Sequence, residues 1–206
     1  MSTTEVILLA SLPPMEPPPP PTTFTGRTVS WYEILEWQQD NRFILSGYRR
    51  ETADYRAIMA GLTFLHNETC NVYTHFLGAL LLPIIAVIVM CVLHLQPRFS
   101  GVSGADYAIF AIFFCCAEVC LLFSAAFHLL SAHSQRVERF WHRMDLLGIV
   151  VVTAGTFISG IYYVFFCAPA LQKIHWLIVS HSKALHLPFT GPQSRWHKRA
   201  DRNAPF

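Results

Sequence analysis

Long uninterrupted runs of apolar residues dominate the middle of this sequence. Three runs predict helices over about Phe76 to Leu95, Ala105 to Leu130 and Leu146 to Cys167. Each is long enough to cross a hydrocarbon layer about 30 Å thick, because a span takes about 20 helical residues. A fourth apolar piece stops after Val179, too soon for a span. The pattern therefore predicts an all-α integral membrane protein with three transmembrane helices.

The segments outside these helices divide the rest of the chain into three parts. Residues 1–30 contain a run of prolines, which neither continues a helix nor pairs inside a sheet, and they predict a disordered tail. Residues 31–75 mix aromatic, apolar and charged positions. That mixture predicts amphipathic helical pieces at the membrane surface, a cytoplasmic cap packed on the helix ends, or both together. Residues 76–179 form the transmembrane region, and residues 180–206 predict an irregular basic tail unrelated to it.

Composition and charge agree with a membrane protein. Of the 206 residues, 53% are hydrophobic and 14% charged, and the formal net charge is +2. The six cysteines lie in or beside the apolar runs, without the spacing of a zinc knuckle or a disulfide framework. The basic residues of the C-terminal tail are dispersed and lack interleaved aromatics, so we expect no nucleic-acid partner.

The arginines lie unevenly on the two sides of the predicted helices. Those before the first helix are Arg27, Arg42, Arg49, Arg50 and Arg56; Arg98 follows it; Arg136, Arg139 and Arg143 lie between the second and third. Because short basic loops stay in the cytoplasm, this distribution predicts a cytoplasmic N-terminus and a cytoplasmic loop over residues 131–144. The chain is thus expected to be a multi-pass membrane protein with its N-terminus inside.

Polar residues rarely found in membranes gather near the cytoplasmic ends of the second and third helices. Ser124 and His128 are one helical turn apart on the same face, and Asp145 opens the antiparallel helix that follows. They form either a functional site or an interhelical hydrogen-bond cluster that stabilises by about 1 kcal/mol per bond. Glu118, near the middle of the second helix, is expected to be neutral and hydrogen-bonded within the bundle or to border a substrate path.

A second polar series precedes the first predicted span. Glu68, Asn71 and His75 follow one another at i, i+3 and i+7, so they share one face if the helix extends back this far. Helix capping and interfacial placement would explain the same residues without a functional role.

These motifs resemble those of the progestin and adipoQ receptor (PAQR) family, which includes the haemolysin III proteins, and most resemble the fungal members. The matching pieces are EWQQDNRFILSGYR over residues 36–49, E-x-x-N-x-x-x-H at Glu68, Asn71 and His75, S-x-x-x-H at Ser124 and His128, and D-x-x-G at Asp145 and Gly148. Each motif alone is loose, whereas their order and spacing over about residues 31–179 make the combination specific.

The resemblance implies a seven-helix bundle with a cytoplasmic N-terminus, of which this chain is the N-terminal portion, ending after the third helix. It further implies that His128 is one of three histidine ligands of a zinc ion near the inner leaflet, with Ser124 and Asp145 supporting the zinc and its water. The other two ligands belong to an H-x-x-x-H pair on the family's last helix, and this sequence has no such pair on a predicted span.

Two functional classes follow. The family implies a zinc-dependent receptor, or a lipid amidohydrolase of ceramidase type in which zinc activates a water and polarises an amide carbonyl. With one family ligand, this chain alone is expected to bind zinc weakly and to lack amidohydrolase activity. The alternative is a non-catalytic three-helix protein that associates with other membrane helices. Expected partners are membrane lipids, a lipid or sterol-like ligand, and further transmembrane helices in a homo- or hetero-oligomer.

Overall fold

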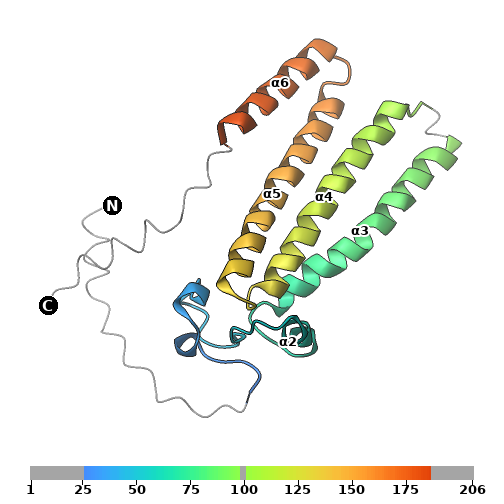
Figure 1. The fold of residues 1–206 in the computed structure, drawn as a ribbon. Coiled ribbons are helices and arrows are strands. Elements are labelled where there is room, and N and C mark those ends of the chain that lie inside the picture. Colours follow the sequence, from blue (N-terminus) through green and yellow to red (C-terminus); the bar gives the residue numbers. More distant parts are fainter. Residues whose placement is uncertain (1–25, 98–100, 187–206) are drawn as a thin grey trace, which may run out of the picture.

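The structure, a computed structural model, describes residues 26–97 and 101–186. Helices stand side by side in chain order, with a cap of mostly irregular chain at one end (Figure 1). They are α3 (Thr69–Leu95), α4 (Gly104–Leu130), α5 (Gln135–Val164) and α6 (Pro169–His186). The cap holds the 3-10 turns η1 (Trp31–Glu33), η2 (Glu36–Gln38) and η3 (Gly61–Thr63) and the short helix α2 (Tyr55–Ala60). The predicted all-α class is confirmed, whereas the proline-rich segment lies outside the described ranges.

Three helices among the described residues are long and apolar enough to cross a membrane, namely α3, α4 and α5. This confirms the predicted number of spans. α3 and α5 begin earlier than about residues 76 and 146, where their apolar runs start. An α-helix satisfies its own backbone hydrogen bonds whatever its side chains, so it continues past the apolar stretch into polar surroundings. Hydropathy therefore gave the membrane portion of each helix and not its full length.

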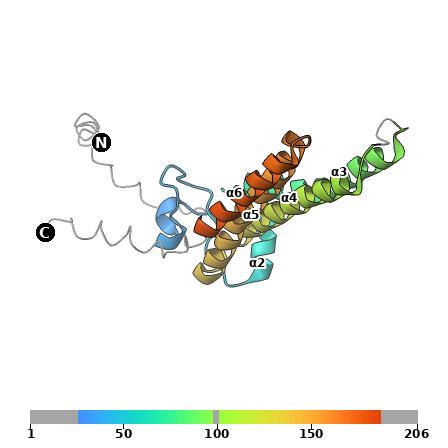
Figure 2. The same ribbon diagram turned by 90° about the horizontal axis from the view of Figure 1, so that it is seen from above.

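α6 differs from the irregular segment that was predicted from residue 180, because this helix continues to His186. It runs back along α5 (Figure 2). The Trp176 indole Nε1 donates a hydrogen bond to the Ile158 carbonyl at 3.3 Å, and the His175 ring stacks on Phe165 with 4.2 Å between centroids. α6 is not among the helices apolar enough to span. Its apolar run is indeed short, but a short apolar run limits burial in lipid and not helix formation.

Glycines allow α4 to pack closely against α5. A Cβ added at Gly155 would stand 2.7 Å from the Cys116 Cβ, and one added at Gly148 would stand 3.0 Å from the Cys120 Cα. Small residues thus permit close helix approach at both positions. At Gly160, by contrast, no heavy atom of the described residues lies within 4 Å of an added Cβ. α4 also contacts α3, so it is the central helix of the row.

The cap has a small apolar core of its own and docks on the ends of the helices. Val29 and Tyr48 pair in an isolated bridge and are buried with Ile34. The Thr52 N–H donates to the Ala132 carbonyl at 3.1 Å, in the turn between α4 and α5. This arrangement agrees with a cap packed on the helix ends, and it places the cap at the end of the bundle that carries His128.

Candidate functional site

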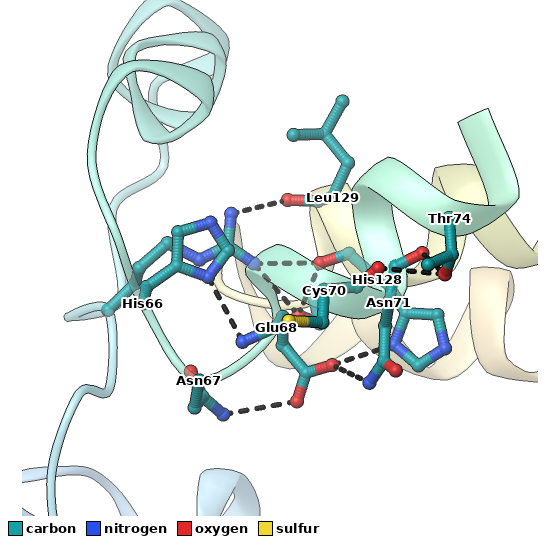
Figure 3. A network of polar contacts seen from close by, with 10 residues as sticks. His66, Asn67, Glu68, Cys70, Asn71, Thr74, His128 and Leu129 are labelled. Atoms are coloured by element: carbon teal, nitrogen blue, oxygen red, sulfur yellow. Dashed lines mark hydrogen bonds and ion pairs between the residues drawn. The ribbon is translucent and has the colours of Figure 1, made fainter. Parts of the chain in front are cut away.

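His128 lies in the last turn of α4 and is paired with Glu68, the residue directly before α3. The His128 Nδ1 lies 2.8 Å from the Glu68 Oε2, and the two side chains are 19% and 17% exposed. The pair brings together residues 60 positions apart in sequence. Figure 3 shows the imidazole beside the carboxylate, with Asn71 next to both. The site thus forms where the end of α4 meets the beginning of α3.

Glu68 is held by its neighbours on both carboxylate oxygens. Asn67 Nδ2 donates to Oε1 at 3.0 Å, and Asn71 Nδ2 donates to Oε2 at 2.8 Å. Burial raises the pKa of this carboxyl, but the hydrogen bonds from His128 and Asn71 and the charge of Arg49 act against burial, and the net pKa is lowered. Glu68 therefore offers a fixed carboxylate to the imidazole.

Arg49 reaches from the cap under the end of α4. Its Nη1 donates to the Leu129 carbonyl at 2.8 Å, and its Nη2 donates to the His128 carbonyl at 2.7 Å and to the Ser131 Oγ at 3.2 Å. The last carbonyls of a helix lack intrahelical donors, so a buried guanidinium satisfies them. Burial lowers the pKa of Arg49 to about 10, although the charge of Glu68 acts in the opposite direction. Arg49 thus stays charged and anchors the backbone of His128.

His66 completes the network as a neutral, buried imidazole. Its Nδ1 accepts a hydrogen bond from the Glu68 N–H at 3.1 Å (Figure 3). Burial and the nearby Arg49 lower its pKa to about 4, against the opposing effects of Glu68 and a hydrogen bond with the Gly61 backbone. Sequence reasoning did not single out His66. It gave Arg49 no role beyond its place in the EWQQDNRFILSGYR motif and among the arginines before the first span, because the contacts of both residues depend on how the cap folds.

The predicted face of α3 is present. Asn71 bonds Glu68, as described, and the His75 ring lies 5.7 Å from the His128 ring between centroids. The His75 Nδ1 is buried without a hydrogen-bond partner among the described residues. The alternative that these groups only cap the helix is therefore incomplete, since Glu68 and His75 both face His128.

Ser124 and Asp145 lie at the same end of the bundle as His128. Ser124 is 4% exposed and one turn before His128 on α4. Asp145 is half-buried on α5, one turn before the Gly148 contact with Cys120. Within the described ranges no hydrogen bond joins Asp145 to Ser124 or His128. The role of Ser124 and Asp145 as supporting groups remains a prediction.

A metal site can be tested against these residues. In the described part of the chain no three His, Cys, Asp or Glu side chains are grouped so that they could hold a metal ion. His128 by itself suits a ligand, because metal-binding histidines commonly give their second ring nitrogen to a carboxylate, as Nδ1 does to Glu68. The described residues thus fit one imidazole ligand and not a complete centre.

Glu118 was expected to be neutral and hydrogen-bonded or to border a substrate path. Its Oε2 is buried in the bundle without a hydrogen-bond partner among the described residues, so the expected hydrogen bond is missing at this oxygen.

Comparison with known proteins places the chain in a family. Residues 63–190, more than half of the chain, match the family model described as haemolysin-III related. The chain belongs to the haemolysin III family. It is similar to receptors of the PAQR group, among them the three described next. The ADIPOR-like receptor IZH2 of Saccharomyces cerevisiae is 34% identical over 140 residues, covering 68% of this chain and 43% of that protein. The adiponectin receptor protein of Drosophila melanogaster is 34% identical over 145 residues, covering 70% and 32%.

The third relative is progestin and adipoQ receptor family member 3 of Homo sapiens. It is 32% identical over 142 residues, covering 68% of this chain and 44% of that protein. The haemolysin III chain therefore spans less than half the length of these curated relatives. Its three apolar helices and its family make it a multi-pass integral membrane protein. The matched region also continues past residue 180, into the segment that was predicted to be unrelated.

Proposed function

We propose that this chain forms the N-terminal part of a seven-helix PAQR-type receptor and that His128 contributes one of three imidazole ligands to a zinc ion. The observation that carries the proposal is the Glu68 carboxylate 2.8 Å from the His128 Nδ1, which leaves Nε2 for a ligand bond. A zinc ion bound by three imidazoles supplies a Lewis acid that lowers the pKa of a bound water towards 7.

The residues of this chain have separate tasks in the proposal. Glu68 and Arg49 hold the ring and the backbone of His128, as their hydrogen bonds support. Ser124 borders the same face of α4, and Asp145 offers a carboxylate that orients a water or accepts its proton. In a complete bundle these groups would serve a receptor for a lipid or sterol-like ligand, or a ceramidase-type hydrolysis of a lipid amide.

The proposed orientation places the site at the cytoplasmic leaflet. Arginines are concentrated in the cap and in the segment 135–143, at the same end of the bundle as His128. Basic segments near the ends of spans favour the cytoplasmic side.

The second candidate is a non-catalytic helical protein that associates with other membrane helices. It is favoured by the apolar side chains that α3 exposes along its length. Both candidates need further helices, but only the first needs zinc at His128.

Zinc analysis of a chimera separates them. Residues 1–164 are joined to the part of the Saccharomyces relative that follows the residue aligned with position 164. We expect one zinc ion per chimera and its loss in His128→Ala, with His94→Ala at the exposed far end of α3 as the matched control. A folded chimera without zinc, or one that keeps zinc after His128→Ala, would refute the proposal.

A further inference from the structure

The hydrogen bonds around Glu68 determine which nitrogen of His128 carries a proton. An ionised carboxylate only accepts hydrogen bonds. Its Oε1 accepts from Asn67 and its Oε2 from Asn71, and the His128 Nδ1 lies 2.8 Å from the same Oε2. Since a carboxylate is a weaker base than an imidazole, the proton in this contact stays on nitrogen. His128 therefore donates through Nδ1–H.

The carboxylate is well fixed for this task. Besides the two asparagine side chains, the Glu68 backbone N–H is held by the Nδ1 of His66 at 3.1 Å. The His128 side of the contact is equally constrained, because Arg49 binds the His128 carbonyl at 2.7 Å and the neighbouring Phe127 ring lies 5.0 Å from the imidazole between centroids. The imidazole can rotate only by breaking the Glu68 contact.

We propose that Glu68 is a positioning residue that holds His128 in the Nδ1–H tautomer and so directs Nε2 to the ligand. A neutral imidazole binds a metal through its unprotonated nitrogen, so this tautomer fixes both the ligating atom and the ring orientation. The choice of zinc as that ligand rests on the proposed function above, whereas the tautomer does not. The hydrogen bond between Glu68 and His128 thus joins the segment before α3 to the end of α4.

The experiment uses the full chain in detergent micelles with ¹⁵N-labelled histidine, free of metal, at about pH 8, where a free imidazole is neutral. Long-range ¹H–¹⁵N correlation assigns the tautomer of His128, whose signals are identified by their absence in His128→Ala. We expect Nδ1–H in the wild type and in Glu68→Gln, whose side-chain carbonyl still accepts. We expect loss of this preference in Glu68→Ala and no change in Glu51→Ala, an exposed glutamate of the cap.

Zinc titration of the same substitutions, made in the chimera described above, supplies the second measurement. Glu68→Ala should weaken zinc binding by the chimera about 10- to 100-fold, as loss of such outer contacts does at metal sites, and Glu51→Ala should leave it unchanged. If the tautomer changes as expected but the folded chimera binds no zinc, the positioning role stands and the zinc proposal loses its support.

Two results would overturn the inference. One is an Nε2–H tautomer in the wild type, and the other is an unchanged Nδ1–H population in folded Glu68→Ala. If Glu68→Ala does not fold, the wild type decides through hydrogen exchange. A protected Nδ1–H supports the inference, and one that exchanges as fast as the ring N–H of exposed His94 contradicts it.

Discussion

Buried charged side chains connect the cap to the helices at the residue scale. Arg49 is 6% exposed and lies within the electrostatic reach of both Glu68 and His66. Removing one of these three side chains leaves the other two buried without their partner. The resulting loss of stability is larger than the contribution of the intact interaction. The network should therefore respond to substitution far more than exposed charges nearby.

Arg49 and Arg50 form a matched pair for testing this. Arg49→Ala leaves the carbonyls of His128 and Leu129 without their donor, so we expect a loss of about 2 to 4 kcal/mol in the free energy of unfolding. Arg50 makes one exposed ion pair with Glu33, and Arg50→Ala should cost under about 1 kcal/mol. Denaturation in micelles measures both, and equal losses would contradict the anchoring role of Arg49.

His66 predicts a pH dependence of stability. Its pKa in the folded chain is about 4, below the ordinary 6.5, so between these values the unfolded state binds a proton that the folded state refuses. The contribution of neutral His66 is complete above pH 6.5 and is lost as the pH falls to about 4. The loss is on the order of 2 to 3 kcal/mol.

Substitution of His66 tests this pH dependence directly. His66→Asn keeps an acceptor for the Glu68 N–H but does not titrate. The difference in the free energy of unfolding between variant and wild type should therefore change between pH 6.5 and about 4. His94→Asn is the control. A wild type and His66→Asn with parallel pH curves would show that His66 does not contribute.

At the scale of elements, glycines determine how closely α4 and α5 pack. The interface between α4 and α5 depends on Gly148 and Gly155, each facing atoms of α4 at distances that leave no room for a side chain. Gly160 lies on the same helix in open space. Substitution by alanine should therefore destabilise the bundle at Gly155 but not at Gly160.

We expect Gly155→Ala to destabilise the bundle by about 1 to 3 kcal/mol, because its Cβ overlaps Cys116 and forces α5 away from α4. Gly160→Ala should be neutral or stabilise by up to about 1 kcal/mol, since alanine favours helix. Thermal unfolding of both variants in micelles makes the comparison. A tolerated alanine at 155 would mean that the helices lie further apart than the structure shows.

The polar network lies at one end of the whole molecule. The cap, the turn between α4 and α5, and the Glu68–His128 pair share that end, while the end of α3 and the beginning of α4 lie at the other (Figure 1). In a membrane this separation gives the described part of the protein one polar, structured side, with the turn between α5 and α6 on the opposite side.

Single cysteines in a cysteine-free background test the proposed orientation. In sealed microsomes, whose outer surface is cytoplasmic, a membrane-impermeant maleimide should label Gln135→Cys directly. Gly101→Cys, between α3 and α4, should react only after detergent is added. Both positions are exposed. The reverse pattern would place the cap and His128 on the non-cytoplasmic side.

The sequence by itself determined the number of spans and the pairing of Ser124 with His128 on one face, since run length and helical period are local properties. It also located Glu68, Asn71 and His75 on one face of α3. Only the tertiary structure decided that Glu68 binds His128 across 60 residues and that Arg49 reaches the Leu129 carbonyl across 80. No local pattern encodes such contacts, because they depend on where the cap docks and on how closely glycines let the helices approach. Hydropathy likewise did not determine where α3 and α5 begin or how far α6 extends. Backbone hydrogen bonds and contacts with neighbouring helices determine these bounds.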